Sequence, residues 1–170
     1  PCEWAALCER NAPSDEQVME SVRAIVETVR KEGDQALRRF AHDFDCATIT
    51  DIELTDDERT LLAAQTSAEV QQAIQHALHN IQAFHKAQKP MMVEVETQPG
   101  VHCVQKAVPI QRVGLYIPGG RAPLFSTVLM LAAPAVIAGC KEIVLCTPQG
   151  ADGHIAPEII YAANICGIHH

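Results

Sequence analysis

The sequence predicts an α/β protein with two parts, a helical and hairpin part over residues 1–112 and a strand–helix–strand (βαβ) unit that begins at residue 113. Three observations predict this fold class. Apolar residues recur at helical spacing as far as residue 89, they alternate with charged residues from residue 93, and two short β-branched runs then flank an apolar stretch. A strand, a helix and a second strand in this order are typical of a parallel sheet. We therefore place a domain boundary near residues 109–112.

Helices are predicted in the first part because capping residues bound each apolar stripe. The inferred helix starts and stops are Ser14 with Gln17, Gly33, Asp34, Phe44-Asp45, Thr55 with Glu58, Ser67 and Lys89-Pro90. The stripe of the longest helix consists of Val70, Ile74, Leu78, Ile81 and Phe84. Residues at this spacing fall on one side of a helix, so we expect these side chains to face the core.

A hairpin is predicted after these helices. Residues 93–96 alternate valine with glutamate, Pro99-Gly100 marks a turn, and residues 101–107 make the return run. A period of two places the valines on one face of the strand and the glutamates on the other. We therefore expect this hairpin to have one solvated face.

The βαβ unit is the stretch around which the chain is organised. Residues 113–123 are predicted to form a strand that leads into a glycine-proline loop, residues 124–138 an apolar helix, Glu142–Cys146 a second strand, and residues 155–166 a last helix. Short β-branched runs between chain breakers are typical of parallel strands covered on both faces. Ligands bind at the carboxyl ends of such strands, so we expect a binding site at residues 116–123.

Charge and composition exclude several classes of function. The formal net charge is -8 and no basic cluster compensates it, which argues against nucleic acid or an anionic membrane as a partner. The seven cysteines show no C-x-x-C pair, and this indicates a reducing, cytosolic compartment. The longest strongly apolar run, residues 124–138, is too short to span a bilayer, and no signal peptide is visible.

The loop after the first βαβ strand holds the candidate binding residues. Gly119 and Gly120 would let a backbone approach a ligand closely, although the spacing is not G-x-G-x-x-G and a tight turn alone would also explain two glycines. The ring of Tyr116 could pack on a base or a nicotinamide, or it could be a core tyrosine with a satisfied hydroxyl. Ser126 and Thr127 could cap the following helix and offer its N–H groups to an anion, or bond back within the helix.

The histidines predict no site. His76 and His79 lie three residues apart on the longest helix, off its apolar stripe, with no further ligand at a suitable spacing. No Ser-His-Asp or Cys-His order is defensible, and His169-His170 is either native or the start of a purification tag. The residues by themselves indicate a nucleotide-binding α/β protein whose function is open.

Several long motifs, in the right order, resemble the histidinol dehydrogenase family. They are Gly33-Asp34-x-Ala36-Leu37, Glu96-Thr97-Gln98-Pro99-Gly100-Val101, Val113-Gly114-Leu115-Tyr116-Ile117-Pro118-Gly119-Gly120 and residues 123–132. The resemblance runs in register over residues 4–167, and the sequence of residues 122–127 is similar to that of the enterobacterial branch.

The resemblance implies an enzyme that oxidises L-histidinol to L-histidine through histidinal, with NAD and zinc, as a cytoplasmic homodimer of histidine biosynthesis. It also implies an aldehyde-dehydrogenase-like architecture, in which residues 113–170 begin an incomplete Rossmann-like, dinucleotide-binding domain and residues 1–112 are part of the first large domain. Phe44, Tyr116 and Pro118 match family positions at the NAD site, and we place Gly119 and Gly120 beside them.

Members of the family run to more than twice this length. By resemblance, the zinc ligands and the catalytic pair would follow His170, so we expect no metal ligand and no catalytic residue in this chain. It would then be an amino-terminal piece that carries part of the NAD site and no turnover. The alternative is a non-catalytic nucleotide-binding or interaction module with the same fold.

Overall fold

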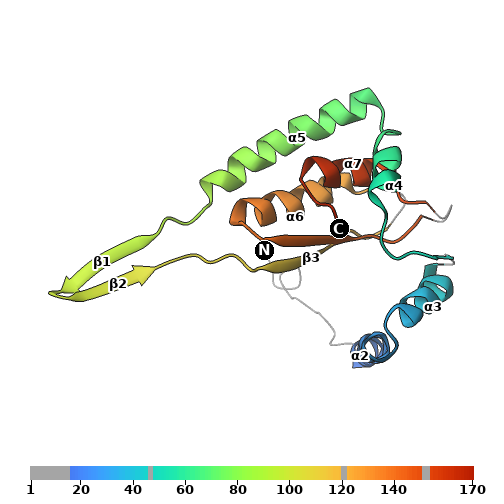
Figure 1. Cartoon of the computed structure of the whole chain (residues 1–170), viewed down its shortest axis with the longest axis horizontal. Helices are drawn as coiled ribbons and strands as arrows, with labels where there is room; N and C mark the ends of the chain where they lie inside the picture. The colour runs from blue at the N-terminus through green and yellow to red at the C-terminus, as the bar shows by residue number, and fades with distance from the viewer. Residues whose placement is uncertain (1–15, 46–47, 120–121, 151–153) are drawn as a thin grey trace, which may run out of the picture. The chain divides into compact units, whose positions relative to one another are not determined.

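The structure is a computed structural model that describes residues 16–45, 48–119, 122–150 and 154–170 (Figure 1). Its elements in chain order are α2 (Glu16–Glu32), α3 (Asp34–Asp45), α4 (Asp56–Ala63), α5 (Ala68–Ala87), β1 (Val93–Gln98), β2 (Val101–Gln105), β3 (Arg112–Tyr116), α6 (Phe125–Ala138), β4 (Glu142–Cys146) and α7 (Pro157–Ile165). The chain divides into two compact units, residues 1–40 and 41–170, and each is described by itself. The predicted α/β class is confirmed, whereas the predicted domain boundary near residue 112 stays a prediction.

The first unit contains α2 and most of α3. Gly33 separates the two helices with a left-handed φ of 58°, which glycine adopts without a steric cost, and its N–H donates to the carbonyl of Val29 at 2.8 Å. This confirms the predicted helix end. Ser14, the predicted start, lies outside the described residues. None of the helices in the described part of the chain is both long and apolar enough to cross a bilayer.

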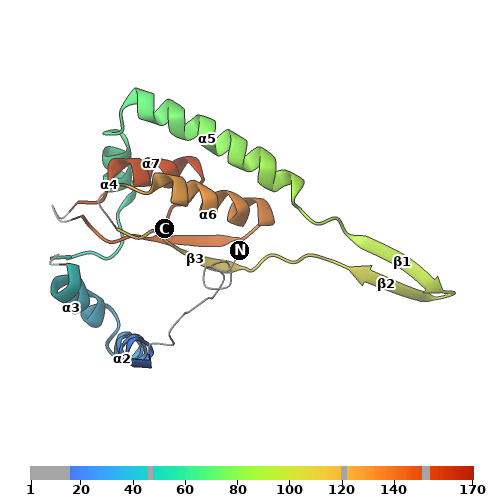
Figure 2. The same cartoon turned by 180° about the vertical axis from the view of Figure 1, so that it is seen from behind.

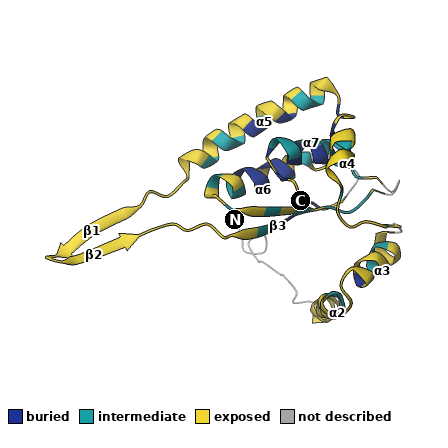
Figure 3. Cartoon of the chain, in the orientation of Figure 1, coloured by how far each residue is buried: buried dark blue, intermediate teal, exposed yellow. Residues whose placement is uncertain are grey.

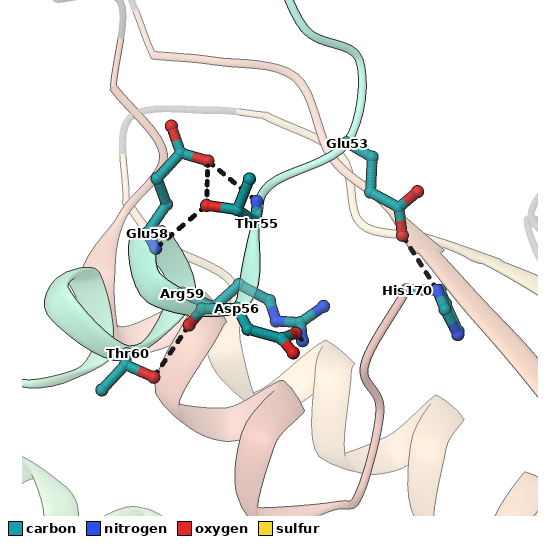
Figure 4. Close-up of polar contacts among 7 residues, drawn as sticks. All are labelled: Glu53, Thr55, Asp56, Glu58, Arg59, Thr60 and His170. Atoms are coloured by element: carbon teal, nitrogen blue, oxygen red, sulfur yellow. Dashed lines mark hydrogen bonds and ion pairs between the residues drawn. The ribbon is translucent and has the colours of Figure 1, made fainter.

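Helix α4 opens with the predicted capping box (Figure 4). The backbone N–H and the hydroxyl of Thr55 donate to the Glu58 carboxylate at 2.8 and 2.7 Å, and the Glu58 N–H donates to the Thr55 hydroxyl at 3.3 Å. These bonds satisfy donors that a helix start otherwise leaves unpaired. They also stabilise the charged carboxylate, so the pKa of Glu58 lies below its ordinary value, first through the backbone donor and then through the hydroxyl.

Replacement of Thr55 by alanine is expected to lower the free energy of unfolding by about 1 kcal/mol at neutral pH, the usual cost of losing such a cap. Because the folded pKa of Glu58 is depressed, its share of this stability is present above the pKa of the unfolded chain and is lost as the pH falls through the folded pKa. Urea unfolding at pH 7 and near pH 3 tests both statements. Glu58→Gln, which cannot titrate, is the control; an equal difference between wild type and Thr55→Ala at both pH values would contradict the assignment.

The core of the second unit lies on one face of the β3–β4 sheet, where α6 packs on β3 and α5 packs in turn on α6 and α7 (Figures 1, 2 and 3). The largest side chains that lose all exposure are Ile74, Ile117, Leu129 and Val128. Four members of the predicted stripe of α5 follow the prediction, being buried (Ile74, Leu78) or packed against the core (Val70, Ile81). The prediction was wrong for Phe84, which is 64% exposed and packs edge-on against the ring of His85, because the last turn of α5 runs past the end of α6.

Strands β1 and β2 form the predicted antiparallel hairpin, with Val95 opposite Cys103. Gly100 has a φ of 82°, and its N–H donates to the Glu96 carboxylate at 2.8 Å, which fixes the turn. The expectation of a single solvated face was wrong, because every residue of both strands is exposed (Figure 3). Alternation predicts which side chains share a face, but coverage depends on whether another element packs there.

Strands β3 and β4 pair in parallel across the crossover helix α6, with Tyr116 opposite Cys146. The predicted βαβ unit is therefore confirmed. The predicted coverage of both sheet faces is not confirmed. Leu115 is the buried residue of β3, whereas Gly114 and Tyr116, which point to the opposite face, are exposed. Helices α6 and α7 pack on the Leu115 side, where the core lies. Tyr116 thus ends its strand with an accessible side chain.

Candidate functional site

The candidate site lies at the carboxyl ends of β3 and β4. The Ile117 N–H donates to the carbonyl of Cys146 at 2.9 Å, which extends the parallel ladder one bond past the strands. Beyond this bond, the segments that follow β3 and β4 form the walls of a cavity of about 540 Å³, which is within the size range of small-molecule sites. Its lining residues are Asp45, Tyr116, Pro118, Gly119, residues 122–124, residues 147–150, His154, Ala156 and Ile159.

Three of the five predicted residues line this cavity, namely Tyr116, Pro118 and Gly119. Tyr116 is 63% exposed, so its ring is available to a ligand and the alternative of a core tyrosine is wrong. Gly120 lies outside the described residues. Phe44 is 64% exposed near the end of α3 and is not in the cavity wall, although its neighbour Asp45 is. The structure therefore does not bring Phe44 to the cavity, and its role stays a prediction.

The reason for a glycine at position 119 is side-chain packing and not an unusual backbone conformation. The described glycines with a left-handed φ are Gly33, Gly100, Gly139 and Gly167, so Gly119 is not one of them. A Cβ atom at Gly119 would instead lie 2.7 Å from Cγ of Pro148, a separation at which carbon atoms clash. The sequence suggested either a close approach to a ligand or a tight turn, and the structure adds a third reason, the close approach of a proline ring.

The sequence reasoning missed the second wall, which follows β4. Thr147, Pro148, Gln149 and His154 line the cavity from this side, and the Gly150 N–H donates to the carbonyl of His154 at 2.8 Å. The rule that ligands bind at the carboxyl ends of neighbouring parallel strands applied to β4 as much as to β3 and could have found them. Motif-like glycines drew attention to one loop only.

Ser126 and Thr127 do not cap α6. The N-cap is Leu124, no side chain bonds the first turn, and both hydroxyl residues lie inside the helix. The start of α6 nevertheless reaches the cavity, because Pro123 and Leu124 are in its wall. Unpaired N–H groups at a helix start favour a negative charge.

A second cavity, of about 440 Å³, is lined by residues of β4 and of the loop before α4. Glu53 accepts a bond from His170 there at 2.9 Å, and Arg59 pairs with Asp56. The Leu145 N–H donates to the carbonyl of His170 at 2.8 Å, so one backbone group of this edge is paired with the end of the described chain. The other backbone groups of a strand edge suit a neighbouring strand more than a small molecule, and no ligand is assigned to this cavity.

The remaining reactive side chains offer little chemistry. His76 and His79 are exposed, as predicted from their place off the stripe of α5. Among the described residues no three His, Cys, Asp or Glu side chains come together as a metal site. Burial raises the pKa of the Cys166 thiol to about 11, so this cysteine stays protonated at neutral pH and serves as an apolar core residue.

A parallel βαβ unit with a cavity at the carboxyl ends of its strands is typical of ligand-binding α/β proteins. The family model for histidinol dehydrogenase matches residues 8–170. Histidinol dehydrogenase from Bacteroides thetaiotaomicron is 48% identical over 98% of this chain, and that from Escherichia coli K12 is 49% identical over 91%. The crystal structure of the Elizabethkingia anophelis enzyme superposes with a TM-score of 0.91 at 46% identity over 99% of the chain. The chain belongs to the histidinol dehydrogenase family.

The chain spans only part of these relatives. It covers 39% of the Bacteroides thetaiotaomicron protein, 35% of the Escherichia coli protein and 39% of the Elizabethkingia anophelis chain. The fold similarity therefore extends over nearly all of this chain and about two fifths of the solved structure. The remaining three fifths of that solved structure have no counterpart among the residues of this chain.

Proposed function

We propose that the whole protein to which this chain belongs is an NAD-dependent histidinol dehydrogenase, which oxidises L-histidinol to L-histidine in histidine biosynthesis. The chain contributes part of the NAD site. The observation that carries this proposal is the cavity at the ends of β3 and β4, where Tyr116, Pro118 and Gly119 lie together. Family membership is the basis for the proposed reaction, and the cavity is the basis for the proposed position of NAD.

The groups around the cavity suit a dinucleotide. The exposed ring of Tyr116 offers a flat apolar surface to a base or a nicotinamide. The start of α6, where Pro123 and Leu124 line the cavity, has no side-chain cap, and the N–H groups of a helix start suit a pyrophosphate. Gly119 is exposed, so its backbone can approach a ligand without a side chain in between. NAD would supply the hydride acceptor, and these residues would bind and orient it.

We also infer that residues 113–170 begin an incomplete Rossmann-like domain within an aldehyde-dehydrogenase-like architecture. The parallel order of β3, α6 and β4 supports this, and so does the glycine-containing loop after β3, whose spacing departs from G-x-G-x-x-G. The boundary near residue 112 is part of the proposal, although α5 packs closely against α6 and α7.

Zinc does not fit the described residues of this chain. A catalytic zinc takes about three protein ligands, and the described residues bring no such group together. The zinc ligands are therefore expected elsewhere in the whole protein. A homodimer in the cytoplasm completes the proposal, on family membership alone.

Tyr116→Ala in the whole protein is expected to raise the KM for NAD about tenfold, because an aromatic contact of this kind contributes about 1–2 kcal/mol. Tyr116→Phe keeps the ring and is the matched control, so its KM should stay near that of the wild type. Initial rates of NADH formation at saturating histidinol measure both variants. A KM in Tyr116→Ala equal to that of the wild type, in a folded protein, would remove Tyr116 from the site.

A further inference from the structure

Two loops meet at the candidate site through a close contact between Gly119 after β3 and Pro148 after β4. A Cβ atom at Gly119 would lie 2.7 Å from Cγ of Pro148, 3.8 Å from its Cβ and 3.9 Å from its Cδ. The ring is therefore seated against the place where any other residue would carry its side chain. A proline ring is closed on its own backbone, so it cannot swing aside as the end of a long side chain would.

The contact lies immediately past the end of the parallel ladder. Tyr116 and Cys146 are the last paired residues, and the Ile117 N–H still reaches the carbonyl of Cys146. Beyond that point, within the part of the chain that the structure describes, no backbone hydrogen bond joins Pro118 or Gly119 to residues 147–150, so packing takes over from hydrogen bonding. Gly119 and Pro148 both line the cavity, one from each wall, and Pro148 is half-buried.

We propose that Pro148 is a positioning residue for the NAD site and acts through Gly119. Its ring sets the separation of the two loops and thereby holds Pro118 and Gly119 in the cavity wall beside Tyr116. This inference rests on the proposed function, because it concerns the same cavity. It assigns Pro148 no contact with the reacting atoms. It also explains why position 119 requires glycine at an ordinary backbone conformation, where conformational freedom gives no reason for one.

The test is a rescue experiment in the whole protein, in the full length that its gene encodes. Gly119→Ala forces a methyl group against the ring, which must move the loops apart, so the KM for NAD is expected to rise about tenfold with kcat much less affected. In the double variant Gly119→Ala/Pro148→Ala the new methyl group at position 119 occupies the space that the ring vacates, so the two loops keep their separation. Its KM is expected to return to within about threefold of the wild-type value.

Gly114→Ala is the matched control. Gly114 lies on the same strand as Tyr116, outside the cavity wall, and a Cβ atom there would meet nothing within 4 Å. Its KM for NAD should equal that of the wild type. If Gly119→Ala is too unstable to purify, the double variant decides: recovery as a folded protein that binds NAD supports the proposal, and failure to recover contradicts it.

The outcomes separate this proposal from the one on which it rests. Wild-type protein that binds no NAD, by titration calorimetry, would overturn the proposed function and this assignment with it. Wild-type protein that binds NAD, with a Gly119→Ala variant that binds equally well, would overturn the assignment alone. A raised KM in Gly119→Ala that persists unchanged in the double variant would also overturn it, because the loss would not then act through Pro148.

Discussion

The 170-residue chain by itself is expected to produce no NADH from histidinol, NAD and zinc, while the whole protein produces it under the same conditions. Hydride transfer requires the substrate to be held against the nicotinamide, together with a group that takes the hydroxyl proton. The described residues supply part of the proposed cofactor site and no cluster of three potential zinc ligands. NAD binding by the chain alone should also be weak, because these residues would bury only part of the cofactor.

Absorbance at the NADH maximum, followed beside a control with the whole protein, measures this expectation. Sustained turnover by the chain alone would show that the reaction requires nothing beyond these residues. The alternative function, a non-catalytic nucleotide-binding or interaction module, predicts a different pattern. In that case the whole protein would bind NAD and show no oxidation of histidinol.

Ile74→Ala is expected to lower the free energy of unfolding by about 2–5 kcal/mol, the usual cost of removing a large aliphatic side chain from a packed core. Ile74 is 0% exposed on the face of α5 that packs against α6 and α7. Because this packing also supports the sheet that ends in the cavity, the variant should lose NAD binding at temperatures where the wild type retains it.

Urea unfolding followed by circular dichroism compares Ile74→Ala with Leu61→Ala. Leu61 has the same number of carbon atoms but is 68% exposed on α4, so its truncation should change the free energy of unfolding by less than about 0.5 kcal/mol. Equal losses in the two variants would show that the core is not where α5, α6 and α7 meet.

Local chemistry predicted the elements of this chain better than their surroundings. The Thr55–Glu58 capping box and the end of α2 at Gly33 depend on residues within one turn, and both are confirmed. Phe84 shares the spacing of the α5 stripe yet is exposed, because spacing cannot say how far a neighbouring helix extends. The prediction of one covered and one solvated hairpin face was wrong for the same reason. Coverage of a face depends on which other element packs there, and the alternation of residues does not specify that element.

The candidate site shows the same division. Tyr116 and Pro118 were predicted to lie at the end of a parallel strand, and the structure places both in the cavity wall. Pro148 carries no motif and is far from Gly119 in the sequence, so only the fold reveals that its ring fills the space beside that glycine. Contacts between two loops depend on the register of β3 against β4, and the sequence pattern does not specify it.

The position of bound NAD in a crystal structure of the whole protein tests the central claim most directly. The claim predicts that the cofactor lies at the carboxyl ends of β3 and β4, with a ring or ribose of NAD within about 4 Å of both Tyr116 and Pro118. The same density would show whether Phe44 reaches the cofactor. NAD bound at a different place, with no atom in contact with Tyr116, Pro118 or Gly119, would contradict the claim.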